Sequence, residues 1–175
     1  FWSEWPEQVL VHFPRPYLDK FDRFAMEFNT ETEVLFSIAR TESAFRSDAK
    51  SPAGAFGLMQ LIPKTADRFA RQVKMTIHSY PHALLNPSIN IRLGARYVSF
   101  LTSYYKGFFP AIYAGYNAGE NVVDLWLKRR HHADPLIWIE TMPFSETKNY
   151  VKLVARNVAV YRYLNQYGKK WVAGL

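Results

Sequence analysis

The periodicity of the apolar residues constrains the fold of this chain most strongly. They recur at three- and four-residue steps in successive segments, the spacing that places side chains on one face of an α-helix. Proline or asparagine stands near the start of several of these segments, where helices tolerate or favour them. The pattern predicts helices over about 18–28, 31–45, 63–73, 87–104, 110–117, 120–130 and 145–166, with a short segment from Asp134-Pro135. The predicted class is mainly α, with at most a short β-hairpin within 46–57.

Two helix ends carry explicit signals. Thr30 and Glu33 have the spacing of a capping box, in which each end residue satisfies a free backbone donor of the other, so a helix is expected from about Glu31. Gly168 follows the last apolar run and is expected to stop that helix just beyond Gln166.

The length and composition favour one folded domain. The chain has 175 residues, of which 49% are hydrophobic and none is cysteine. A chain of this size can bury a core, and the lack of cysteine excludes thiol nucleophiles, disulfides and iron–sulfur ligation. The five histidines form no His-Glu-x-x-His motif and no calcium-loop pattern is present, so we predict no metal and no cofactor.

The net charge of +7 favours an anionic partner, which could be nucleic acid, lipid headgroups or an acidic polymer. The best nucleic-acid patch is 128–132, which we interpret as a solvated helix end. No apolar run is long enough to span a bilayer, so no integral membrane segment is expected. The first five residues, FWSEW, resemble neither an initiator methionine nor a signal peptide, and this favours a processed or excised domain.

Glu42 is the candidate catalytic residue that the pattern itself provides. Leu35, Ile38, Glu42 and Phe45 step by three, four and three, which puts the carboxylate on the apolar stripe of its helix. Burial raises the pKa of a carboxyl group, and a protonated carboxyl near neutral pH can act as a general acid. The alternative is a carboxylate that turns into solvent or pairs with a nearby arginine, Arg40 or Arg46.

Three motifs resemble those of the soluble lytic transglycosylase family. They are TESAFRSDAKSPAGAFGLMQLIP over 41–63, GYNAG over 115–119 and MPFSET over 142–147. Their order and spacing are kept across about 18–163. Two positions depart from the family pattern, because Gly115 stands where alanine is usual and Met142 where isoleucine is usual.

The resemblance implies a lysozyme-like helical domain, related to goose-type lysozyme, with a deep glycan cleft. It implies that 1–175 is one catalytic domain of a larger envelope protein, with a lead-in over 1–17, a tail over 164–175 and a periplasmic or cell-envelope location. Glu42 would be the only catalytic acid and base. The implied substrate-binding residues are Ser43, Ser51, Met59, Gln60, Tyr116, Asn117 and Glu146.

The reaction that the resemblance implies needs one carboxylate. Most glycosidases pair an acid with a second carboxylate, and here the spacing of Asp48, Asp67, Glu120 and Glu146 assigns none of them to Glu42. Glu42 would protonate the bond between N-acetylmuramic acid and N-acetylglucosamine, then take the proton of the C6 hydroxyl as a 1,6-anhydro ring closes. The expected partner is peptidoglycan, whose stem carboxylates suit a basic protein, with no nucleic acid, and the expected state is a monomer.

Two alternatives stay open at this point. A goose-lysozyme-type muramidase would hydrolyse the same bond with the same lone glutamate. A catalytically inactive homologue would bind the glycan without cleaving it.

Overall fold

The computed structural model describes residues 11–129 and 134–172, with the side chains of the last helix described through Gln166. The helices of these ranges are α2 (Leu18–Phe28), α3 (Thr32–Ser43), α4 (Pro63–Gln72), the 3-10 helix η1 (His82–Leu85), α5 (Pro87–Tyr104), α6 (Phe109–Ala118), α7 (Glu120–Arg129), α8 (Pro135–Glu140) and α9 (Ser145–Val172). Over the same ranges the only β pairing is two isolated antiparallel bridges, Lys50 with Phe56 and Phe56 with Leu61. The mainly α class is confirmed.

Several helices begin where the proline and asparagine signals placed them. Asn86 caps α5, because its side-chain oxygen accepts hydrogen bonds from the backbone N–H groups of Ser88 and Ile89. Asp134 caps α8 in the same way. These caps satisfy backbone donors that the first helical turn leaves free, and proline at the first position costs no hydrogen bond there.

Two predicted helix ends are wrong. No capping box forms at α3: the N-cap is Glu31 without a side-chain cap bond, and the hydroxyl of Thr32 donates instead to Asp22 on α2. Glu33 accepts a hydrogen bond from Asn165 on α9, so tertiary contacts recruit the side chain that the box needs. Gly168 does not stop α9, which continues to Val172. One glycine lowers helix stability by only about 1 kcal/mol and does not by itself reverse the chain.

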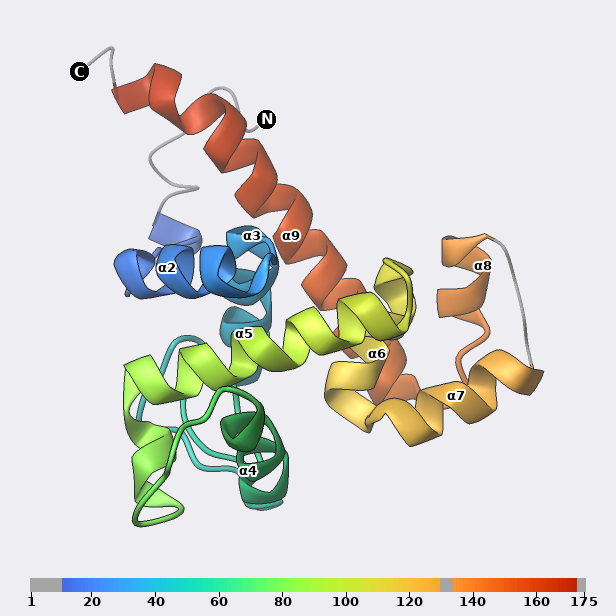
Figure 1. Cartoon of the computed structure of the whole chain (residues 1–175). Helices are drawn as coiled ribbons and strands as arrows, with labels where there is room; N and C mark the ends of the chain where they lie inside the picture. The colour runs from blue at the N-terminus through green and yellow to red at the C-terminus, as the bar shows by residue number, and fades with distance from the viewer. Residues whose placement is uncertain (1–10, 130–133, 173–175) are drawn as a thin grey trace.

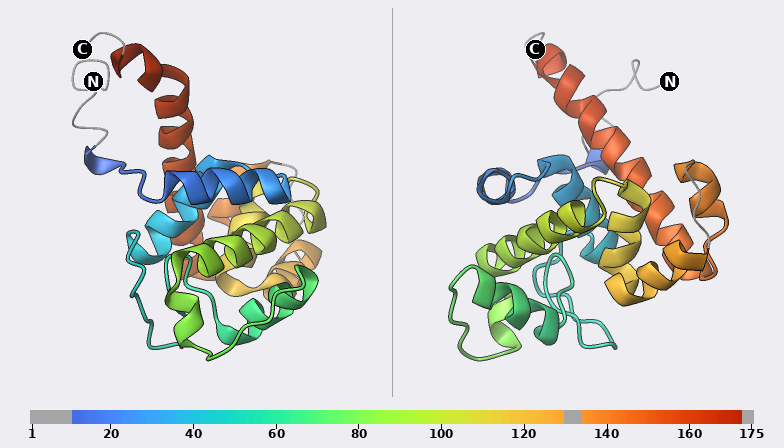
Figure 2. Two further views of the ribbon diagram at one scale, coloured as in Figure 1. Left: turned by 60° about the vertical axis from the view of Figure 1, so that its left-hand side comes forward. Right: turned by 45° about the vertical axis from the view of Figure 1, so that its right-hand side comes forward.

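The helices pack around α3, α5, α6 and α9. Helix α3 lies against α9, α6 lies against both α9 and α5, and α2 crosses α5. The C-terminal part of α9 extends past the other helices, as both views of Figure 2 show. All residues from Val34 to Ala39 are buried, so the middle of α3 is a core segment.

Aromatic contacts fix α3 against its neighbours. The ring of Phe36 lies 4.4 Å from that of Phe21 on α2 and 5.4 Å from that of Tyr161 on α9. Phe13 in turn meets Tyr161 edge-on at 5.5 Å. Because these rings are large and buried, they set the orientation of α3 and therefore of the acid at its end.

Two sequence predictions meet the limits of the described ranges. Of the basic patch 128–132, Lys128 and Arg129 are exposed at the end of α7, while 130–132 lie outside the described residues, as do 1–10 of the lead-in. Within the described ranges, none of the helices combines the length and the apolar character that crossing a bilayer requires.

Candidate active site

Glu42 lies in the last turn of α3 and is partly buried. The helix ends directly after it, because Ala44 and Phe45 adopt left-handed backbone angles of φ 50° and φ 65°. The hydroxyl of Tyr150 on α9 donates a hydrogen bond of 2.7 Å to Oε1 of Glu42. The packing of α3 on α9 thus brings together two residues that are 108 positions apart in the chain.

The arginines that could have neutralised Glu42 are engaged elsewhere. Arg46 pairs with Asp48 at 3.5 Å, and the guanidinium of Arg40 lies 4.3 Å from the ring centre of Phe13. Of the two interpretations of Glu42, the structure therefore favours the carboxyl group on the inner face of the helix.

Burial sets the protonation of this carboxyl group. Loss of water raises the pKa of Glu42 from 4.5 to about 7, and the hydrogen bond from Tyr150 opposes that rise only in part. The tyrosine itself is buried, and burial next to the charge of Glu42 raises the pKa of Tyr150 well above 10. Tyr150 therefore stays a neutral donor while Glu42 can gain or lose a proton near neutral pH.

Tyr116 connects this region to the loop that follows α3. Its hydroxyl donates to the backbone oxygen of Met59 at 2.8 Å, and its ring packs 5.0 Å from that of Tyr97. The Tyr97 hydroxyl donates to the backbone oxygen of Gly115 at 2.9 Å. Burial and the charge of Glu42 raise the pKa of Tyr116 well above 10, so it too stays protonated.

Ser43 and Met59 fix the same loop from two sides. The Ser43 hydroxyl donates to the backbone oxygen of Leu58 at 2.7 Å. The side chain of Met59 has no exposed surface and fills the space beside Gly94, where an added Cβ would lie 2.3 Å from its sulfur. Both residues hold the loop next to the acid, and a direct contact of either with sugar stays a prediction.

The hydrogen bonds of Gln60 and Ser51 close within the loop itself. The side-chain nitrogen of Gln60 donates to the backbone oxygens of Ala49 and Gly57, at 3.2 and 2.8 Å. The Ser51 hydroxyl accepts from the backbone N–H of Ala55 at 3.0 Å. The structure gives neither a bond to Glu42, and their sugar contacts remain predictions.

Asn117 and Glu146 meet at the junction of α6 and α9. The hydroxyl of Thr147 donates to the side-chain oxygen of Asn117 at 2.8 Å, and Asn117 and Glu146 are both exposed. Thr147 precedes Tyr150 by one turn of α9. The Asn117–Thr147 pair is therefore one helical turn along α9 from the tyrosine that contacts Glu42. Binding of sugar by Asn117 and Glu146 stays a prediction as well.

Sequence reasoning missed two residues that organise the site. Tyr150 belongs to the apolar run of the helix predicted over 145–166, so its spacing alone predicts a core position, although it follows Thr147 by one turn on the same helix face. Asn90 is fully buried, accepts a hydrogen bond of 2.7 Å from the backbone N–H of Met59 and donates to the backbone oxygens of Phe56 and Leu84. The only clue in the sequence is an asparagine between two isoleucines, Ile89 and Ile91, within the helix signal of 87–104.

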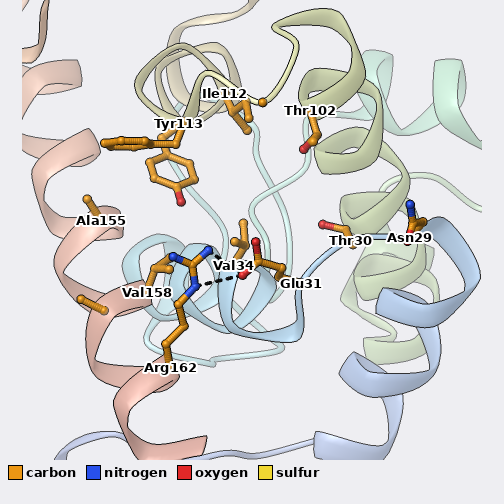
Figure 3. Close-up of a pocket in the computed structure, with 13 residues that line it drawn as sticks. Asn29, Thr30, Glu31, Val34, Thr102, Ile112, Tyr113, Ala155, Val158 and Arg162 are labelled. Atoms are coloured by element: carbon orange, nitrogen blue, oxygen red, sulfur yellow. Dashed lines mark hydrogen bonds and ion pairs between the residues drawn. The ribbon is translucent and has the colours of Figure 1, made fainter. Parts of the chain in front are cut away.

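Glu42 lines neither of two cavities that lie among the described residues. The larger, of about 510 Å³, lies among α3, α5, α6 and α9, with the Glu31–Arg162 ion pair and Tyr113 on its walls (Figure 3). The smaller, of about 410 Å³, lies between the end of α3 and α9. The deep glycan cleft stays a prediction. Over 11–129 and 134–172, no three acidic or histidine side chains lie close enough to hold a metal ion.

A family model and the curated relatives place the chain in the same protein family. Residues 20–139 match the family model described as the transglycosylase SLT domain. The chain is 37% identical over 152 residues to the soluble lytic murein transglycosylase of Escherichia coli K12, covering 86% of this chain and 24% of that protein. The chain therefore spans about a quarter of the length of this relative.

Solved structures agree in fold. The 70-kDa soluble lytic transglycosylase of Escherichia coli superposes with a TM-score of 0.85 at 34% identity, over 92% of this chain and 26% of that one. An inactive glutamate-to-glutamine mutant of the lytic transglycosylase Slt from Pseudomonas aeruginosa gives a TM-score of 0.84 at 39% identity, over 90% of this chain and 26% of that one. The lysozyme-like helical fold expected from the motifs is confirmed.

Proposed function

The chain belongs to the transglycosylase SLT domain family, and from this premise we propose that it cleaves peptidoglycan as a lytic transglycosylase, with Glu42 as its only acid and base. The observation that carries the proposal is the position of Glu42. It is a partly buried carboxyl group at the end of α3, with a pKa raised by burial to about 7 and a neutral tyrosine as its hydrogen-bond partner.

In the first step, protonated Glu42 gives its proton to the oxygen that links N-acetylmuramic acid to N-acetylglucosamine. The bond from C1 of the muramoyl residue to that oxygen breaks, and the substrate's own N-acetyl group stabilises the cationic carbon. A carboxyl group with a pKa near the working pH is suited to this transfer, because it is protonated often enough and still gives up its proton readily.

In the second step, ionised Glu42 accepts the proton of the C6 hydroxyl as that oxygen attacks C1. The product carries a 1,6-anhydro ring and no water is consumed. Tyr150 holds Oε1 of Glu42, which leaves Oε2 as the atom that gives and takes the proton. Its hydrogen bond also favours the ionised state that follows the first transfer.

The surroundings of the other four candidate acids support a mechanism with Glu42 as the only catalytic carboxylate. Asp48 pairs with Arg46, Asp67 with Arg71, and Glu120 with Arg68. Glu146 is exposed at the start of α9. Three of the four candidates for a second catalytic carboxylate are therefore engaged in ion pairs of their own.

The proposed partner of the protein is peptidoglycan, and its proposed location is the periplasm or cell envelope. The E. coli relative is named a murein transglycosylase, and the excess of basic residues suits the carboxylates of murein peptides. We further propose that 1–175 is a single catalytic domain, active as a monomer, with Ser43, Ser51, Met59, Gln60, Tyr116, Asn117 and Glu146 around the bound glycan.

Mass spectrometry of the fragments released from purified peptidoglycan tests this function, with the Glu42→Gln variant as control. We expect muropeptides that are one water lighter than hydrolytic products and lack a reducible end, and no release by Glu42→Gln. Reducible products would instead make the protein a goose-lysozyme-type muramidase. Release that does not depend on Glu42 would refute its role, and binding without any release would indicate an inactive glycan-binding module.

A further inference from the structure

The cavity of about 410 Å³ beside the catalytic end of α3 carries positive charge on two sides. Its walls come from the lead-in, from the end of α3 and from α9, and they include Pro14, Arg40, Thr41, Phe45, Arg156 and Asn157. We propose that this cavity binds a carboxylate group of the peptide stem on the muramoyl residue being cleaved. This inference rests on the proposed function.

The first support is that its arginines have no acidic partner within the described part of the chain. Arg40 lies over the ring of Phe13, and Arg156 donates to the neutral side-chain oxygen of Asn157 at 3.1 Å. The ion pairs formed by the described residues include neither of them. A guanidinium group that lines a cavity without a carboxylate is suited to bind one, since its N–H groups match both oxygens.

A third arginine adds to the positive potential behind this wall. Arg15 follows Pro14, and its Nε and Nη2 atoms are buried with no hydrogen-bond partner among the described residues. Arg15 and Arg40 both lower the pKa of Tyr161, which burial raises to about 12, so both charges lie near that hydroxyl. The Tyr161 hydroxyl donates to the backbone oxygen of Pro14 at 3.0 Å. Unpaired positive charge in a poorly solvated place favours an anion there.

The second support is the position of the cavity relative to Glu42. Thr41 precedes the acid directly and accepts a hydrogen bond of 3.2 Å from Asn157. Asn157 follows Tyr150 by seven residues on α9, which is about 10 Å along a helix. An extended peptide of three residues spans about 10 Å. The length of a stem tripeptide therefore matches the separation along α9 between Tyr150, which contacts the acid, and Asn157, which lines the cavity.

The test compares two glycan substrates: strands with intact peptide stems, and the same strands after an amidase has removed the stems. Because a charge-assisted hydrogen bond is lost, Arg156→Gln should raise KM for stem-bearing strands by about 10-fold. Its kcat and its cleavage of stem-free strands should not change. Arg71→Gln, which removes one positive charge from an exposed pair on α4, should behave like wild type on both substrates.

A second variant distinguishes a loss of binding from a loss of folding. Arg40→Lys keeps the charge and loses the planar fork, so it should weaken binding of stem-bearing strands alone, with an unchanged melting temperature. An equal loss on both substrates, for either variant, would assign these arginines to the glycan or to stability and would overturn the proposal.

Direct binding separates this inference from the proposed function. The inactive Glu42→Gln protein should bind an acidic stem tripeptide, should bind it less well when Arg156→Gln is added, and should prefer it to the amide-capped peptide. Binding of inorganic phosphate as tightly as the tripeptide would reduce the cavity to an unspecific anion site. Glycan cleavage without any tripeptide binding would refute the cavity alone. Tripeptide binding that depends on Arg156, in a protein that cleaves no glycan, would refute the function alone.

Discussion

At Glu42 two effects act on one carboxyl group in opposite directions. Burial at the end of α3 disfavours the charge, while the hydroxyl of Tyr150 favours it, and burial is the larger effect. The result is a pKa of about 7 instead of 4.5. The side chain that gives the protein its proposed activity therefore lowers the stability of the fold whenever it is ionised.

This cost makes the stability of the protein depend on pH. Between pH 4.5 and about 7 the folded protein holds a proton on Glu42 that the unfolded chain releases, so the free energy of unfolding falls as the pH rises through this window. Glu42→Gln has no such proton. We expect it to match wild type near pH 4 and to exceed it at pH 8 by at most about 3 kcal/mol, measured by urea unfolding.

An exposed acid supplies a control of opposite sign. The ion pair with Lys152 lowers the pKa of Glu140, so its stabilising effect is lost as the pH falls. Glu140→Gln should therefore lose stability relative to wild type at high pH rather than gain it. A difference between wild type and Glu42→Gln that is the same at pH 4 and pH 8 would contradict a raised pKa at Glu42.

Tyr150 should set the upper pH limit of activity. Tyr150→Phe removes the hydrogen bond that favours ionised Glu42, so the pKa of that carboxyl should rise further. The limb of the pH profile of kcat/KM on which Glu42 loses its proton should then move to higher pH. Tyr113→Phe, a buried tyrosine on the wall of the larger cavity, should leave that limb in place. An unmoved limb in Tyr150→Phe would remove Tyr150 from the tuning of the acid.

At the scale of elements, one asparagine connects the loop after α3 to α5. Asn90 bonds three backbone groups, in Phe56, Met59 and Leu84, and Gly57 leaves room for it because an added Cβ there would lie 2.5 Å from its nitrogen. Asn90→Ala leaves these groups unpaired in the interior. We expect a loss of about 3 kcal/mol in urea unfolding, since each buried unpaired group costs about 1–3 kcal/mol.

The same substitution should lower kcat/KM for glycan cleavage, because it frees the segment that carries Met59 and Gln60. Asn121→Ala, an exposed position on α7, is the matched control and should change neither quantity. A loss below about 1 kcal/mol in Asn90→Ala would show that the loop is held without it.

The helices were predictable because their signals are local. Apolar spacing and capping residues such as Asn86 act within one or two turns, and Glu42 stood out because an acid interrupted an apolar stripe. The predicted capping box at Thr30 does not form because Asn165 on α9 binds Glu33. A rule that uses only neighbouring residues cannot include a contact with a helix so far along the chain. Tyr150 was missed for the same reason, since its role exists only where α9 crosses the end of α3.

Gly115 shows how packing explains a departure from a motif. A Cβ at this position would lie 3.0 Å from the ring of Tyr105 and 3.1 Å from Leu101. The hydroxyl of Tyr105 in turn bonds the backbone of Glu120 and the side chain of Asp124. The alanine that is usual in the family would therefore press on a tyrosine that connects α5 to α7, and the sequence alone gives no view of that contact.

For the whole molecule, net charge should govern how strongly it is attracted to its proposed substrate. The chain carries +7, and the ion pairs of the described residues use only part of its arginines and lysines. Long-range attraction between this charge and murein carboxylates is screened by salt, because the Debye length falls from about 10 Å at 0.1 M to about 3 Å at 1 M. Binding of the inactive Glu42→Gln protein to insoluble peptidoglycan should thus weaken steeply between these concentrations.

Sedimentation of the protein with peptidoglycan measures this binding, and an uncharged N-acetylglucosamine polymer is the control. Binding to the uncharged polymer should not respond to salt, because only contacts within the proposed groove contribute. Equal salt dependence on both polymers would contradict an electrostatic origin.

Stem carboxylates held in the cavity by Arg40 and Arg156 are screened less than exposed pairs. When Arg156→Gln is added to the inactive Glu42→Gln protein, its binding to peptidoglycan should therefore differ from that of its parent most clearly at 1 M salt, where the long-range attraction is gone and the local contact remains.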